Sequence, residues 1–194
     1  MGRKQYLLYM AQVHTNFRLA ELESLADLFN LKIDFSKYDA HSPFFFLELD
    51  NDEQARQWVE RSILTKAIYE YWGQGETLDL LHETIKQTPG FQERCNQFKQ
   101  SSFKFEFENY QGGKKKDMSI RLKQMESFKY LEFEGKIDLK NPQEIFTIIE
   151  NYESTVGNAA STIPISYFFG RFIAGGNRSA MERYDLKKRP YKGT

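Results

Sequence analysis

The sequence has 194 residues, of which 40% are hydrophobic and 15% aromatic, a composition that provides a packed core and argues against disorder. Lysine plus arginine and aspartate plus glutamate balance at 27 each, so any basic surface for a nucleic acid must be local. The single cysteine, Cys95, excludes an internal disulfide and a metal site made only of cysteines. No apolar run approaches the roughly 18 residues of a membrane span, and no signal peptide is seen. We therefore expect a soluble protein of the cytosol or nucleus with no membrane partner, and we take the cytoplasm as its location.

The first 75 residues alternate between strand and helix patterns. Apolar runs of strand composition alternate with amphipathic stretches, and Asn51 or Asp50 can cap the second helix. The predicted elements are a strand at 5–11, a helix at 17–29, strands at 32–35 and 44–49, a helix from 52 to about 63, and a strand at 66–72. This β-α-β-β-α-β order is that of a ferredoxin-like domain over residues 1–75, which makes the fold class α+β.

The residues from 76 onward form a second mixed α/β pattern after the glycines at 73 and 75. The predicted elements are two helices within 78–98 broken at Pro89-Gly90, an alternating strand at 103–108, a helix marked by Met118, Leu122 and Met125, a helix at 142–152, and a buried strand at 165–173. The helix at 142–152 rests on a local signal: Asn141 as cap, Pro142 in the first turn, and Glu144 completing a capping box. We place the second domain at 76–183 and the start of a linker at 184–194.

No catalytic constellation is apparent. His14, His41 and His82 are far apart and none has metal-ligand spacing to Cys95, so we predict no catalytic and no metal-binding residues. Residues 170–176 have neither the spacing of a Walker loop nor a G-x-G-x-x-G pattern before a helix.

Local electrostatics is the remaining functional signal. Basic residues flanked by glycines suit phosphate binding, because backbone N–H groups can then approach the oxygens as well. The candidate RNA-binding residues are Lys114, Lys115, Lys116, Arg171, Arg178, Lys187, Lys188 and Arg189. Two alternatives stay open: the lysine run at 114–116 is only a solvated turn, or Arg171 braces its loop through a buried carboxylate.

Four segments resemble one enzyme family. They read QYLLYMAQVHTNFRLAELESLADLF at 5–29, FEGKIDLKNPQ at 133–143, YFFGRFIAGG at 167–176 and YDLKKRPYKGT at 184–194. In order and spacing they are similar to the catalytic subunit of the eukaryotic and archaeal tRNA guanosine N2-methyltransferases that modify guanosine-ten. The similarity covers the whole chain.

The resemblance implies a ferredoxin-like domain followed by a THUMP domain, which together dock the acceptor stem and 3′ end of tRNA. It also implies a Rossmann-like domain that binds S-adenosylmethionine and contacts a small zinc-binding activator subunit. That domain's Asp/Asn-Pro-Pro-Tyr motif is missing here, so we expect an N-terminal fragment that binds no cofactor and is catalytically inactive alone. The alternative is an interdomain scaffold that orients the catalytic domain without substantial RNA affinity of its own.

Overall fold

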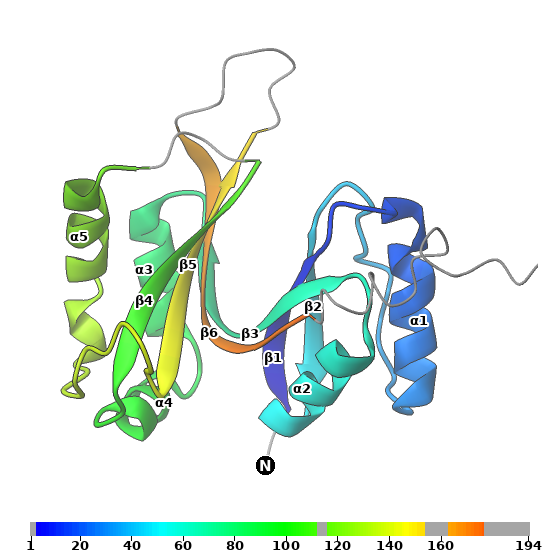
Figure 1. Cartoon of the computed structure of the whole chain (residues 1–194), viewed down its shortest axis with the longest axis horizontal. Coiled ribbons are helices and arrows are strands. Elements are labelled where there is room, and N and C mark those ends of the chain that lie inside the picture. The colour runs from blue at the N-terminus through cyan, green and yellow to red at the C-terminus, as the bar shows by residue number, and fades with distance from the viewer. Residues whose placement is uncertain (1–2, 112–115, 154–162, 177–194) are drawn as a thin grey trace, which may run out of the picture. The chain divides into compact units, whose positions relative to one another are not determined.

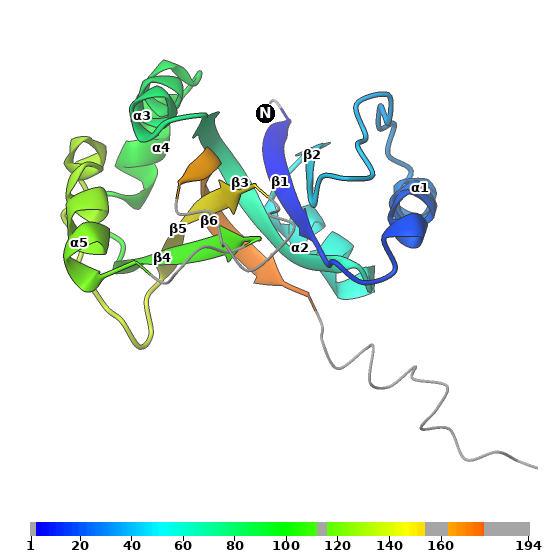
Figure 2. The same cartoon turned by 90° about the horizontal axis from the view of Figure 1, so that it is seen from above.

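The computed structural model describes residues 3–111, 116–153 and 163–176 of the chain (Figures 1 and 2). Their contacts divide them into two compact units, one of residues 3–70 with 173–176 and one of residues 71–172. Two long strands, β3 (Thr65–Gly75) and β6 (Pro164–Gly175), contribute residues to both units. The six strands form a mixed sheet in the order β2-β1-β3-β6-β5-β4, so the predicted combination of helices with a sheet is confirmed.

The first unit is built on β1 (Lys4–Met10), which lies between β2 (Phe44–Leu49) and β3 and is antiparallel to both. Its helices are a short 3-10 turn, η1 (Thr15–Phe17), followed by α1 (Arg18–Leu28), and α2 (Asp52–Arg61). Asn51 caps α2 as predicted: its side-chain oxygen accepts a hydrogen bond of 2.9 Å from the Gln54 amide. Apolar residues of the strands and helices meet in one core, among them Tyr6, Leu8, Leu22 and Trp58.

The predicted strand at 32–35 is not present, so the ferredoxin-like order is not confirmed. Leu31, Ile33 and Phe35 alternate as they would in a strand, and all three pack against the core of the first unit. However, the backbone of residues 32–35 pairs with no strand of the sheet. The strands beside β1 are β2 and β3. The apolar alternation therefore marks an extended segment that covers the core, because alternation reports which side chains are buried and says nothing about hydrogen-bond partners.

The second unit packs three helices on one face of its strands, as both figures show. The helices are α3 (Leu78–Gln87), α4 (Phe91–Phe98) and α5 (Met118–Glu126), with a 3-10 turn η2 (Lys129–Leu131) after α5. The predicted break between α3 and α4 is confirmed, and Gly90 adopts a positive φ of 75° there. The core is largely aromatic: Trp72 packs edge to face on Phe146 and on Phe169, and the rings of Phe146 and Phe169 are stacked.

The predicted helix at 142–152 is wrong, because residues Glu144–Tyr152 form strand β5. β5 pairs in parallel with β4 (Phe103–Tyr110) and antiparallel with β6, and β4 is an edge strand of the sheet. The segment is rich in β-branched residues, and Phe146 to Glu150 are all buried. Burial between two strands with both backbone edges paired outweighs the capping signal of Asn141 and Pro142, which acts only locally.

Candidate nucleic-acid interface

Two of the eight predicted RNA-binding residues fall within the described residues, Lys116 and Arg171. The other six, Lys114, Lys115, Arg178, Lys187, Lys188 and Arg189, lie outside them. Both described cations belong to the second unit.

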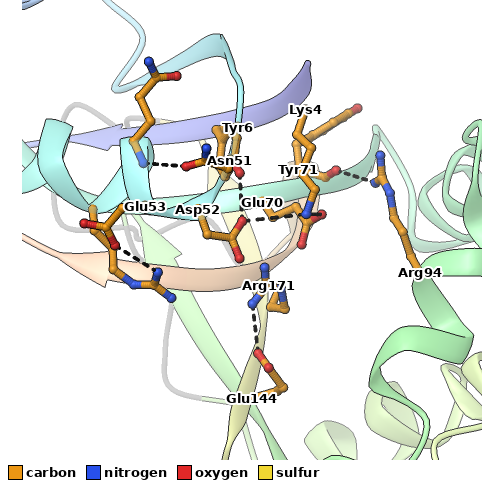
Figure 3. Close-up of polar contacts among 12 residues, drawn as sticks. Lys4, Tyr6, Asn51, Asp52, Glu53, Glu70, Tyr71, Arg94, Glu144 and Arg171 are labelled. Carbon is orange, nitrogen blue, oxygen red and sulfur yellow. Dashed lines mark hydrogen bonds and ion pairs between the residues drawn. The ribbon is translucent and has the colours of Figure 1, made fainter. Parts of the chain in front are cut away.

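Arg171 is a buried cation in the middle of β6, with only 4% of its surface exposed. Its Nη1 donates to Glu144 Oε2 on β5 across 3.0 Å (Figure 3). The guanidinium also lies over the ring of Phe98, 4.5 Å from its centroid. This geometry favours the bracing alternative for Arg171, and a phosphate contact by this residue stays a prediction.

Lys116, just before α5, is also held by a carboxylate. Its Nζ lies 2.6 Å from Glu150 Oε1 on β5, and its side chain is only 18% exposed. Glu150 is itself buried and accepts two further hydrogen bonds, from Gln124 Nε2 at 2.8 Å and from the Tyr152 hydroxyl at 2.7 Å. Burial and this hydrogen bond to Glu150 raise the pKa of Tyr152. Lys116 is therefore a member of a buried polar cluster that joins α5 to β5.

The two carboxylates that hold these cations, Glu144 and Glu150, were missed as site residues. Treating 142–152 as a helix gave Glu144 a capping role and gave Glu150 none. A charged residue directly after the apolar pair Ile148-Ile149 was the available signal, because a buried carboxylate requires a cationic or hydrogen-bonding partner.

A polar cluster of the first unit lies on β1, β3 and the start of α2 (Figure 3). The Tyr6 hydroxyl donates to Asp52 Oδ1 at 2.8 Å, and Lys4 Nζ lies 3.2 Å from Glu70 Oε1 and 3.8 Å from Asp52 Oδ1. These carboxylates thus share a lysine. Within residues 3–111, 116–153 and 163–176, no group of three or more His, Cys, Asp or Glu side chains is placed to hold a metal ion.

An apolar groove of about 580 Å³ opens beside β4 and α5 in the second unit. It is lined by Phe103, Phe105, Phe107, Met118, Arg121, Leu122, Met125, Glu126, Phe128, Lys129, Leu131, Phe133, Ile137 and Leu139. Three of these are charged and the rest are hydrophobic. No described helix is long and apolar enough to cross a membrane.

The fold is that of two solved structures of low sequence identity. PH1313 from Pyrococcus horikoshii aligns with a TM-score of 0.52 at 13% identity over 89% of this chain and 55% of its own. TrmN from Thermus thermophilus aligns with a TM-score of 0.52 at 12% identity over 95% of this chain and 50% of its own. A mixed sheet with this arrangement of helices is thus shared with these proteins.

The chain belongs to the family described as Tmrp11 THUMP N-terminal domain, whose model matches residues 4–178. It is 60% identical over 192 residues to the tRNA (guanine(10)-N(2))-methyltransferase of Saccharomyces cerevisiae, and 34% identical over 190 residues to tRNA (guanine(10)-N(2))-methyltransferase TRMT11 of Homo sapiens. The match covers 98% and 97% of this chain but only 44% and 40% of these relatives. The family resemblance seen in the sequence is therefore confirmed.

Proposed function

We propose that this chain is the tRNA-docking part of a tRNA guanosine N2-methyltransferase, and that it binds the acceptor stem and the single-stranded 3′ end. The observation that carries this proposal is the match of residues 4–178 to a THUMP N-terminal domain, together with 60% identity to a yeast enzyme named for methylation of guanine in tRNA. The domain division at 75/76 and the linker from 184 belong to the same proposal.

The mechanism is positioning, without chemistry by this part of the protein. Cations and loop amides bind phosphates, which fixes the orientation of the tRNA but carries no sequence information. The lysines at 114 and 115, Arg178 and the run at 187–189 are the proposed phosphate contacts. Lys116 and Arg171 contribute by stabilising the segments that carry these phosphate contacts. Each of the two is paired with a carboxylate of the second unit.

S-adenosylmethionine belongs to the proposed whole enzyme and not to these residues. One described strand-to-helix junction contains two glycines, Gly73-Gln74-Gly75 before α3. A Cβ at Gly73 would lie 2.6 Å from Ile85 Cγ1 of α3, so this glycine serves close packing of strand on helix and leaves no space for a cofactor. This junction therefore does not fit the cofactor. We assign a zinc-binding activator subunit and a cytoplasmic location to the proposed whole enzyme.

The test is a tRNA titration with this chain at two salt concentrations. Phosphate contacts release counterions, so affinity should fall steeply with salt. We expect binding to weaken on removal of the 3′ single-stranded end. In a Lys114→Ala, Lys115→Ala double variant we expect weaker binding with a shallower salt dependence, because two of the proposed phosphate contacts are lost. Arg56→Ala is the matched control, since Arg56 is an exposed cation of the first unit that pairs with Glu53 on its own helix. Absence of binding at low salt would favour the scaffold alternative.

A further inference from the structure

Among the described residues, the outer edge of β4 has a backbone partner only at its first residue, Phe103. Phe103 donates its amide to the Lys136 carbonyl and accepts at its carbonyl from the Asp138 amide, both at 3.0 Å, so residues 136–138 run beside the first residue of the strand. Backbone groups alternate in direction along a strand, so Phe105 and Phe107 direct theirs to the same outer side. Among the described residues nothing pairs with them there.

The apolar groove lies against this open edge. The side chains of Phe105 and Phe107 line it from the strand, Met118 and Leu122 from α5, and Leu139 from the segment that begins beside Phe103. Met118, Leu122 and Leu139 are 66%, 50% and 74% exposed. A contiguous apolar surface of this kind at a sheet edge is typical of a binding site for another polypeptide.

One cation of the groove, Arg121, forms no ion pair with any residue that the structure describes. The Nε of Arg121 is buried and makes no hydrogen bond to any described residue, and its guanidinium lies 5.1 Å from the ring centroid of Phe107. No described carboxylate forms an ion pair with it. A half-buried arginine whose Nε is shielded from water and unbonded is complementary to an acidic group brought in by a ligand.

We propose that this site binds an extended segment of a partner protein, which adds as a strand beside Phe105 and Phe107. Its apolar side chains fill the groove and one aspartate or glutamate reaches Arg121. Nucleic acid suits the groove poorly, because interfaces with nucleic acid are rich in cations and polar donors and this lining is mostly aliphatic and aromatic. The proposal does not depend on tRNA docking, which uses other residues.

The opposite face of β4 carries charged residues, which limit the segments that can pair with this edge. Lys104 Nζ lies 2.6 Å from Glu106 Oε1 on that face, and Glu108 follows in the same row. Charged residues on an edge strand disfavour indiscriminate pairing between copies of a protein. A segment that adds here must therefore match both an apolar face and a charged face.

The probe is a fluorescein-labelled nine-residue peptide of the sequence SVSLSESVS. Its apolar residues and its glutamate lie on one face of a strand, and serines lie on the other. Binding to the whole chain is followed by fluorescence anisotropy.

We expect Leu122→Glu to weaken binding at least tenfold, since it places a charge in the groove. Ile120→Glu is the matched control: it lies on the same helix, is 47% exposed and does not line the groove, and it should bind as the parent chain does. A peptide with glutamine in place of glutamate should bind the parent chain about fivefold more weakly, and Arg121→Gln should remove that difference.

Hydrogen exchange decides whether the segment adds as a strand. Bound peptide should slow amide exchange at Phe105 and Phe107, and leave the amide of Phe103, already bonded to Lys136, unchanged. Binding without this protection would overturn strand addition. Equal affinity of the Leu122→Glu and Ile120→Glu variants would show that the peptide does not bind in the groove. Displacement of the peptide by a short single-stranded RNA, or absence of any peptide binding, would overturn the assignment to a protein partner.

Discussion

The guanidinium of Arg171 lies 3.0 Å from the carboxylate of Glu144, and this ion pair joins two neighbouring strands diagonally. Arg171 on β6 is directly opposite Phe146 on β5, and Glu144 lies two residues before Phe146 on the same face. The guanidinium also lies over the ring of Phe98, which belongs to the aromatic core of the second unit. Its cost on removal is therefore that of a buried charge, not that of a surface salt bridge.

Replacing Arg171 by alanine should lower the free energy of unfolding by about 3 kcal/mol, because Glu144 loses its cation in a mostly buried site. Urea denaturation followed by circular dichroism measures this loss. Arg56→Ala, which removes an exposed cation, should change it by less than about 0.5 kcal/mol. If Arg171 contacts phosphate instead, the variant will keep its stability and reduce the salt dependence of tRNA binding.

Glu150→Gln should destabilise the chain by about 2 kcal/mol, since the neutral amide leaves the Lys116 ammonium without its counterion and cannot accept from three donors equally. The neighbouring exposed Glu153 provides a control, and Glu153→Gln should unfold at the parent urea concentration. A double-mutant cycle with Lys116→Met then isolates the pair. Additive losses in that cycle would show that Lys116 and Glu150 do not interact.

Stability should depend on pH through His82. Its Nδ1 lies 2.9 Å from the Tyr130 hydroxyl and its Nε2 lies 2.9 Å from Ser127 Oγ, which itself donates to the Gln124 carbonyl. Burial lowers the pKa of His82, the Lys86 ammonium lowers it further, and Asp79 opposes. The unfolded chain thus binds the proton more readily than the folded chain.

The stabilisation by neutral His82 is therefore complete above pH 6.5 and is lost as the pH falls from there toward the lowered folded pKa. The stability difference between the parent chain and His82→Gln should narrow between about pH 7 and pH 5. Denaturation midpoints at several pH values measure it, with the exposed His41→Gln as control. A difference that stays constant over this range would contradict a neutral, hydrogen-bonded His82.

The single cysteine offers a clean chemical test of burial. Burial first, and then the charge of Glu132, raise the pKa of Cys95 from 9.0 to about 11, against a smaller opposing effect of Arg94. The thiolate is the reactive form, so its fraction at pH 8 should be about a hundredfold lower in the folded chain than in the unfolded chain. Alkylation by iodoacetamide, with and without urea, measures the ratio of rates. Comparable rates would mean that the Cys95 site is open to solvent.

Local and periodic signals predicted much of the fold. The asparagine cap of α2, the break between α3 and α4 at Pro89-Gly90, and the alternation in β4 each depend on neighbours in sequence, and each is confirmed. The buried strand β6 was predicted because it is apolar on both faces. These features need no knowledge of distant contacts.

The candidate site was less predictable for the opposite reason. Charge and nearby glycines selected Lys116 and Arg171, yet the partner of each is a carboxylate some 30 positions away in the sequence, across 34 residues for Lys116 and 27 for Arg171. Only strand pairing brings these groups together, and that pairing depends on residues 144–152 being a strand. Because a helix was predicted there, Glu144 and Glu150 were not recognised as the partners of these cations.

By itself, the sequence determined the α+β class, most element positions and the family, because composition, periodicity and motif spacing are properties of the chain alone. The tertiary structure decided that residues 144–152 join β4 and β6, that residues 32–35 cover a core without pairing, and that Lys116 and Arg171 are held by buried carboxylates. Each of these depends on backbone hydrogen bonds and desolvated charges between distant residues, whose free energies outweigh local preferences.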